Sequence, residues 1–172
     1  MGRVVYDVPL IRQEDNDICW VACAAMITSE RRSCSVGIGH FLHGLDPARA
    51  SIGNPSSRRS QQVQFLSLWG FDTEAIDASN AGIERTLQSY GPFILGHFCL
   101  CFPYGVWPPV TDPFATPSVV VTGFDSAVND GTCWINNPWG DKDQPVFSNA
   151  VINALNRFQG YGFGAASHYR VS

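Results

Sequence analysis

Apolar residues near the start of the chain follow the spacing of a helix. The run from residue 19 to residue 27 is Cys-Trp-Val-Ala-Cys-Ala-Ala-Met-Ile. Within it Cys19, Ala22, Cys23 and Met26 fall at i, i+3, i+4 and i+7, which is the spacing of one helix face. This pattern predicts a buried helix that begins at Cys19 and ends in the charged segment 30–33.

Three further helices are expected, and the first two stop at glycine, a residue that commonly ends helices. Gly70 and Gly91 provide these stops. The predicted helices cover residues 60–68, 81–90 and 149–158. Residues 34–60 contain several Gly, Pro and Ser, which predicts a loop with one short helix near 37–44.

Strand-forming residues dominate the second half of the chain. After a short extended strand at residues 3–11, three β-rich runs bounded by turn residues are predicted as strands: 93–100, 118–124 and 131–136. The segment 103–117 contains five prolines, and long loops of this kind are often functional. Helices early and antiparallel strands late predict an α+β fold, with residues 1–172 forming a single domain.

Composition narrows the function classes. Hydrophobic residues make up 45% and charged residues 15% of the 172 positions, which is typical of a globular chain. The net charge is −4, and the local basic cluster Arg58-Arg59 is short and lies in a Ser-rich segment, so no nucleic-acid partner is expected. No cofactor is indicated, and the sequence leaves the oligomeric state open.

The sequence also carries expectations about location. No run approaches the ~18 apolar residues that a membrane span needs, and the first ten residues lack the organisation of a signal peptide. We therefore expect no membrane partner, and a cytoplasmic protein or one exported without a classical signal peptide. In either case the six cysteines are expected to be reduced thiols.

A cysteine at the first turn of a helix has a physical reason to be reactive. Unpaired N–H groups and the helix dipole favour the thiolate and lower its pKa. Acyl transfer also needs a donor for the oxyanion, which Gln13 on the preceding segment can supply. It further needs a general base, usually histidine, and a residue that orients this base.

Several motifs together resemble those of papain-like cysteine peptidases. Gln13 precedes the pair Cys19-Trp20 by the interval of the family's oxyanion-hole glutamine and Cys-Trp pair. The segment Asn137-Pro-Trp-Gly140 resembles the family's Asn-x-Trp-Gly segment. Residues 91–95 and 119–125 resemble the two strands that flank the active site. Their order is similar to that of compact bacterial peptidases of effector and bacteriocin-processing types.

The resemblance implies a fold and a set of site residues. A central helix that starts at the nucleophile Cys19 would pack on a C-terminal antiparallel sheet. Asn137 would orient the base, and Trp139 would cover their contact. Trp139, Trp20, Pro117 and Ser118 would line a cleft for a peptide or protein substrate.

The chain departs from the family pattern at the general base. The family's histidine lies two residues before the Val-Val-Val run, and here Pro117-Ser118 occupies that place. Neither side chain can take a proton from a thiol near neutral pH. No histidine occurs between residues 98 and 167, so His97 is the only nearby candidate.

Three interpretations follow from this departure. In the first, His97 replaces the missing base from the neighbouring strand; strand parity is compatible with this side chain pointing either toward Cys19 or away from it. Alternatively, Cys19 acts without a base and turns over slowly. In the third interpretation the chain is an inactive pseudo-peptidase that uses its cleft, shaped by the loop 103–117, to bind a peptide or protein.

Structural roles compete with these functional ones. Cys23 is expected to be a core residue, Gln13 to cap a turn as an alternative to oxyanion binding, and Asn137 to start a turn before Pro138. A zinc site is a weaker hypothesis, built from His97, Cys99, Cys101 and Cys133; no metal is expected. The other histidines, His40, His43 and His168, are expected at the surface.

Overall fold

A computed structural model describes residues 2–13, 18–42, 63–96, 118–159 and 165–169. The helices are α1 (Cys19–Arg32), α2 (Ile38–Leu42), a helix over residues 63–68, α5 (Asn80–Tyr90) and α6 (Ser148–Gln159). The strands are β1 (Arg3–Val5), β2 (Phe71–Ala75), β3 (Phe93–Leu95), β4 (Val119–Asp125), β5 (Thr132–Asn137), β6 (Asp141–Phe147) and β7 (Ala165–Tyr169). The α+β prediction is confirmed.

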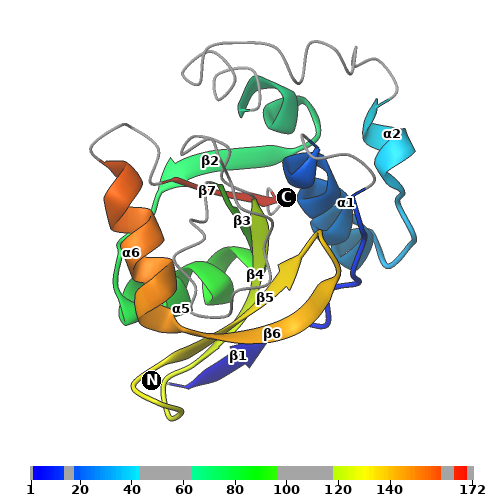
Figure 1. The fold of residues 1–172 in the computed structure, drawn as a ribbon. Coiled ribbons are helices and arrows are strands. Elements are labelled where there is room, and N and C mark those ends of the chain that lie inside the picture. Colours follow the sequence, from blue (N-terminus) through cyan, green and yellow to red (C-terminus); the bar gives the residue numbers. More distant parts are fainter. Residues whose placement is uncertain (1, 14–17, 43–62, 97–117, 160–164, 170–172) are drawn as a thin grey trace, which may run out of the picture.

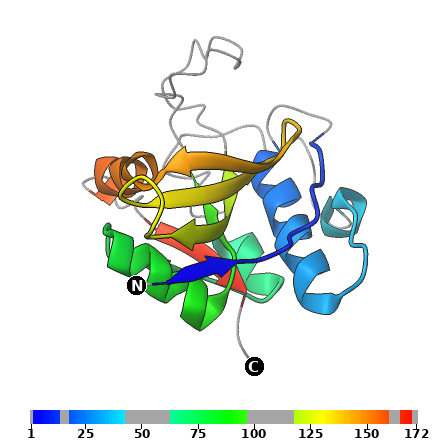
Figure 2. The ribbon, with the colours of Figure 1, turned by 90° about the horizontal axis from the view of Figure 1, so that it is seen from below.

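The strands form one antiparallel sheet. Its order is β2-β7-β3-β4-β5-β6, and β1 pairs with residues 123–125 at the C-terminal end of β4. Helix α1 lies on one side of this sheet, and α5 and α6 lie on the other (Figures 1 and 2). That a single domain spans residues 1–172 stays a prediction.

Strand β4 divides the core into two apolar clusters. Successive side chains of a strand point to opposite faces of the sheet. Val119 and Val121 therefore join a cluster closed by α5 and α6, the α5/α6 cluster. Val120 joins a second cluster built around α1, the α1 cluster. A central strand buried on both faces in this way has the continuous apolar run seen in the sequence.

The helix ends agree with the sequence prediction. Helix α1 begins at Cys19 and ends before Ser33, whose φ of 49° is left-handed. Helix α5 begins after Ser79, whose hydroxyl accepts a hydrogen bond from the amide of Gly82 at 3.0 Å, and it ends at Gly91 with a φ of 81°. Among the described residues no helix has the length and apolar character that a bilayer span needs.

Three strands escaped the sequence prediction because their own residues are poor strand signals. β2 has one large apolar residue, Phe71; β6 contains three charges and Pro145; and β7, Ala-Ala-Ser-His-Tyr, has no β-branched residue. Each forms because a neighbouring strand supplies its hydrogen-bond partners. β1 spans Arg3–Val5 instead of the expected 3–11, since the chain leaves the sheet after the amide of Tyr6 donates to Thr122.

Candidate active site

Cys19 lies buried at the first turn of α1, with 9% of its surface exposed. The N-cap residue is Ile18, whose side chain makes no capping hydrogen bond. The polar segment 14–17 before it lies outside the described residues. With no side-chain cap, the amides of Cys19 and Trp20 are available to the sulfur.

Ser118 is the residue that β4 brings to this sulfur. Its backbone N–H donates a hydrogen bond to Cys19 Sγ at 3.2 Å, and its side chain also bonds the thiol. Ser118 itself is buried. The start of β4 and the start of α1 therefore meet, although 99 residues separate them in the chain. Pro117, the other residue at the place of the expected histidine, lies outside the described residues.

Burial decides the protonation of Cys19. It raises the pKa of the thiol, and the hydrogen bonds from Ser118 and from the helix start lower this pKa without cancelling the effect. The expectation of a pKa lowered by the helix start is therefore wrong for the free protein. Removing a thiolate from water costs more free energy than these donors return.

Gln13 lies beside the turn between β5 and β6. Its backbone N–H donates to the carbonyl of Pro138 at 2.9 Å. In the antiparallel ladder of β4 and β5, Val120 pairs with Asn136. This ladder ends at that pair, so the start of β4 and the turn after β5 lie at the same end of the sheet. Two hydrogen bonds join distant segments of the chain there: Ser118 to Cys19 and Gln13 to Pro138.

Asn137 is buried at the end of β5, and its side chain bonds within its own turn. Its Oδ1 accepts from the amide of Trp139 at 3.0 Å, and its Nδ2 donates to Asp141 Oδ2 at 3.1 Å. The amide of Gly140 closes the turn onto the carbonyl of Asn137 at 2.9 Å. The role of Asn137 in orienting a base stays a prediction, while these contacts give it a structural role.

The two tryptophans assigned to the cleft differ in exposure. Trp20 is 4% exposed and packs edge-on against Phe65, with ring centroids 5.3 Å apart. It belongs to the α1 cluster, so its indole is a core group behind Cys19. Trp139 is 43% exposed and is the member of the pair that a ligand can reach.

The two histidines that the structure describes are engaged away from Cys19. His40 is exposed and packs against Phe41 and Trp69. His168 is buried in β7, where Nε2 lies 3.0 Å from Glu74 Oε1 and the ring stacks on Tyr90. The prediction of a surface position for His168 is wrong, because β7 is inserted between β2 and β3.

The remaining candidates of the sequence analysis lie partly outside the described residues. His97, His43, Cys99 and Cys101 all do, together with the Pro-rich segment 103–117. Cys133 is buried in the α5/α6 cluster, and burial raises the pKa of its thiol to about 12. Cys23 is fully buried in the α1 cluster, as expected of a core residue.

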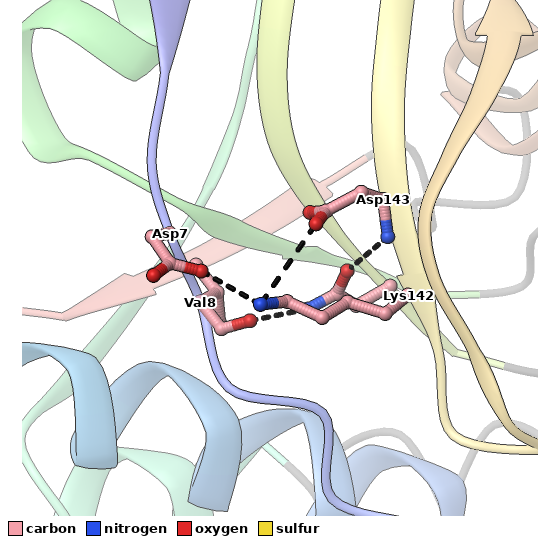
Figure 3. Close-up of polar contacts among 5 residues, drawn as sticks. Asp7, Val8, Lys142 and Asp143 are labelled. Carbon is pink, nitrogen blue, oxygen red and sulfur yellow. Dashed lines mark hydrogen bonds and ion pairs between the residues drawn. The ribbon is translucent and has the colours of Figure 1, made fainter.

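Asn136 is a site-forming residue that the sequence analysis missed. Its side chain is fully buried; Nδ2 donates to the carbonyl of Val8 at 2.8 Å, and Oδ1 accepts from the amide of Asp143 at 2.8 Å (Figure 3). Beside it Lys142 Nζ lies 2.7 Å from Asp7 Oδ1. These contacts hold the segment leading to Gln13 against β5 and β6. The Asn-Asn pair at the end of a predicted strand was the only signal in the sequence.

Comparison with known proteins agrees with this architecture. The family described as papain-like cysteine protease AvrRpt2 matches residues 3–157. The chain therefore belongs to this family of papain-like cysteine peptidases. The match confirms the resemblance drawn from the motifs around Cys19 and Asn137. A search of curated proteins found no match.

Proposed function

We propose that this chain is a thiol-dependent hydrolase of a peptide or isopeptide bond, with Cys19 as its nucleophile. The sulfur attacks the scissile carbonyl, and the Gln13 side chain and the Cys19 amide bind the oxyanion that forms. Asn137 positions the general base, for which His97 is the candidate. The substrate is a polypeptide, in keeping with the family, and no metal or other cofactor takes part.

The contact between Ser118 and Cys19 Sγ at 3.2 Å carries this proposal. It sets the residue next to the family's usual histidine position directly against the nucleophile. A buried cysteine in a core has no need of such a donor, as Cys133 illustrates, where burial is the only influence on the pKa. The hydrogen bond from the backbone N–H of Gln13 to the carbonyl of Pro138 positions the second residue of the proposed site, the oxyanion donor.

A different observation favours a binding module as the alternative function. Burial raises the pKa of Cys19, so at neutral pH the sulfur is a protonated thiol unless a base removes its proton. The described histidines, His40 and His168, contact other residues. A pseudo-peptidase on this fold would retain the cleft and bind a peptide or partner protein without cleaving it.

Alkylation by iodoacetamide separates the two functions. We expect Cys19 to be alkylated at neutral pH faster than Cys34, the exposed free cysteine among the described residues. In the hydrolase, a base or the bound amide group of the reagent activates the sulfur of Cys19, whereas Cys34 reacts as an ordinary thiol. Peptide mapping by mass spectrometry gives the rate for each of the six cysteines. If Cys19 reacts no faster than Cys34, the hydrolase proposal is wrong and the binding module stands.

The pH profile of the same reaction identifies the base. A base that forms an ion pair with the sulfur gives a rate that is already high at pH 6 to 7, near the ordinary pKa of histidine. A thiol without a base keeps its raised pKa, so its rate climbs only at alkaline pH. The variant His97→Ala distinguishes the cases: loss of the neutral-pH reaction assigns the base to His97, and an unchanged profile removes it from the mechanism.

A further inference from the structure

Arg12 is the residue before Gln13, and its guanidinium lies on the turn that carries Trp139. A Cβ placed on Gly140 would lie 3.2 Å from both Cζ and Nη2 of Arg12 and 3.3 Å from Nε. Gly140 also has a φ of 134°, which side chains rarely adopt. Only glycine therefore allows this close approach between the guanidinium and the backbone.

The three nearly equal distances show which part of Arg12 is covered. A point equally far from Cζ, Nη2 and Nε lies above the guanidinium plane and not at its edge. The plane thus faces Gly140, while the N–H groups point along the plane. These N–H groups form the fork that binds a carboxylate through two parallel hydrogen bonds.

Among the described residues, no acidic side chain forms an ion pair with this fork. Arg12 is exposed, and among the ion pairs of the described residues none includes it. The neighbouring acid in the turn, Asp141, accepts a hydrogen bond from Asn137 Nδ2 at 3.1 Å. Arg12 therefore lies against the backbone of this turn and carries a positive charge without a described counter-ion.

The position of Arg12 ties it to the site of Cys19. The backbone N–H of Gln13, its neighbour in the chain, donates to the carbonyl of Pro138 at 2.9 Å. Pro138 follows the end of β5 that pairs with the start of β4, and Ser118, just before β4, donates to Cys19. We propose that Arg12 is a specificity residue at the rim of this site and that it binds the carboxylate of an aspartate or glutamate in the polypeptide ligand. The inference deepens the proposed function and rests on the same site.

Two matched peptides test the recognition without any reaction at sulfur. The probes are acetyl-Gly-Gly-Glu-Gly-Gly amide and its Gln counterpart, and the readout is the indole N–H signal of Trp139 in nuclear magnetic resonance titrations. We expect the Glu peptide to bind about threefold more tightly than the Gln peptide, as for an exposed ion pair, and this preference to weaken with added salt.

Arg12→Gln should remove the preference, Arg12→Lys should retain part of it, and Arg3→Gln, at another exposed arginine, should leave it unchanged. An equal preference in the wild type and Arg12→Gln would overturn the inference.

A second pair of probes links recognition to Cys19. Bromoacetyl-(Gly)n-Glu amide and its Gln counterpart, with n from 0 to 3, alkylate accessible thiols. We expect the Glu form to react with Cys19 about threefold faster at one or two lengths, and Arg12→Gln to abolish this advantage. Binding without a rate advantage at any length would place the anion site away from Cys19 and refute its part in this cleft. If Cys19 reacts with no reagent, the hydrolase proposal fails, while the titrations still decide the role of Arg12.

Discussion

Two buried thiols, Cys133 within the α5/α6 cluster and Cys19 beside the α1 cluster, have different surroundings on the two faces of the sheet. In the α5/α6 cluster Cys133 is surrounded by hydrocarbon, and burial raises its pKa to about 12. Against the α1 cluster Cys19 is also buried, but amide and hydroxyl donors of Ser118 and amides of the helix start face its sulfur. Burial alone therefore does not separate these two cysteines. The donors at the junction of a helix start and a strand start distinguish the two.

The largest effect is expected when each of the two cysteines is replaced by alanine, which removes its sulfur. Cys19→Ala should lower kcat/KM for the hydrolysis of denatured casein by about 10⁴-fold or more, because the nucleophile is lost. Cys133→Ala should leave kcat/KM unchanged and lower the free energy of unfolding by about 1 kcal/mol through lost packing. Mass spectrometry of new peptide termini and urea unfolding measure the two quantities. Equal turnover of the wild type and Cys19→Ala would remove the functional difference between the clusters.

The next largest effect should come from returning an imidazole to the sulfur. Ser118→His places a titratable base on the residue whose amide already contacts Cys19 Sγ. We expect casein hydrolysis to rise by about 10²-fold, the lower range for general-base catalysis, and Cys19 alkylation to become fast near neutral pH. Ser118→Gln is the control of similar size without a titratable group. If both variants behave alike, a base at this position is not what limits turnover.

A smaller effect, on the free energy of unfolding, is expected at Asn136, whose hydrogen bonds hold the N-terminal segment against β5 and β6. Asn136→Ala leaves the carbonyl of Val8 and the amide of Asp143 without their buried partner. The free energy of unfolding should fall by about 2 kcal/mol. Asn137→Ala is the comparison, since the bonds of Asn137 lie within one turn, and it should cost less in urea unfolding. A larger loss for Asn137→Ala would show that the hydrogen bonds within the turn, and not those of Asn136, stabilise this region.

The smallest effect is expected at the exposed pair beside Asn136. The hydrogen bond that Lys142 donates to Asp7 raises the pKa of Lys142, yet the side chains are 41% and 90% exposed. Water and salt screen such a pair, so Lys142→Ala should lower the free energy of unfolding by less than about 1 kcal/mol, and less still in 0.5 M NaCl. Lys142→Arg should restore the loss. A loss above 2 kcal/mol would mean that this pair, rather than Asn136, fastens the N-terminal segment.

Most elements with strong local patterns could be predicted from the sequence. The start of α1 at Cys19, the end of α5 at Gly91 and the buried strand β4 all follow from apolar spacing and from glycine. The strands β2, β6 and β7 could not, because their residues pair only when neighbouring strands are in place. The buried position of His168 was missed for the same reason.

The sequence by itself determined the family of this protein and its candidate site residues, since the order of Gln13, Cys19 and Asn137 along the chain and the helical spacing after Cys19 are local properties. Only the tertiary structure decided the state of those residues. The raised pKa of Cys19, the Ser118 donor, the fastening by Asn136 and the placement of Arg12 on Gly140 all arise between segments far apart in the chain. Burial and nonlocal hydrogen bonds depend on which segments pack together, and no spacing along a sequence encodes that directly.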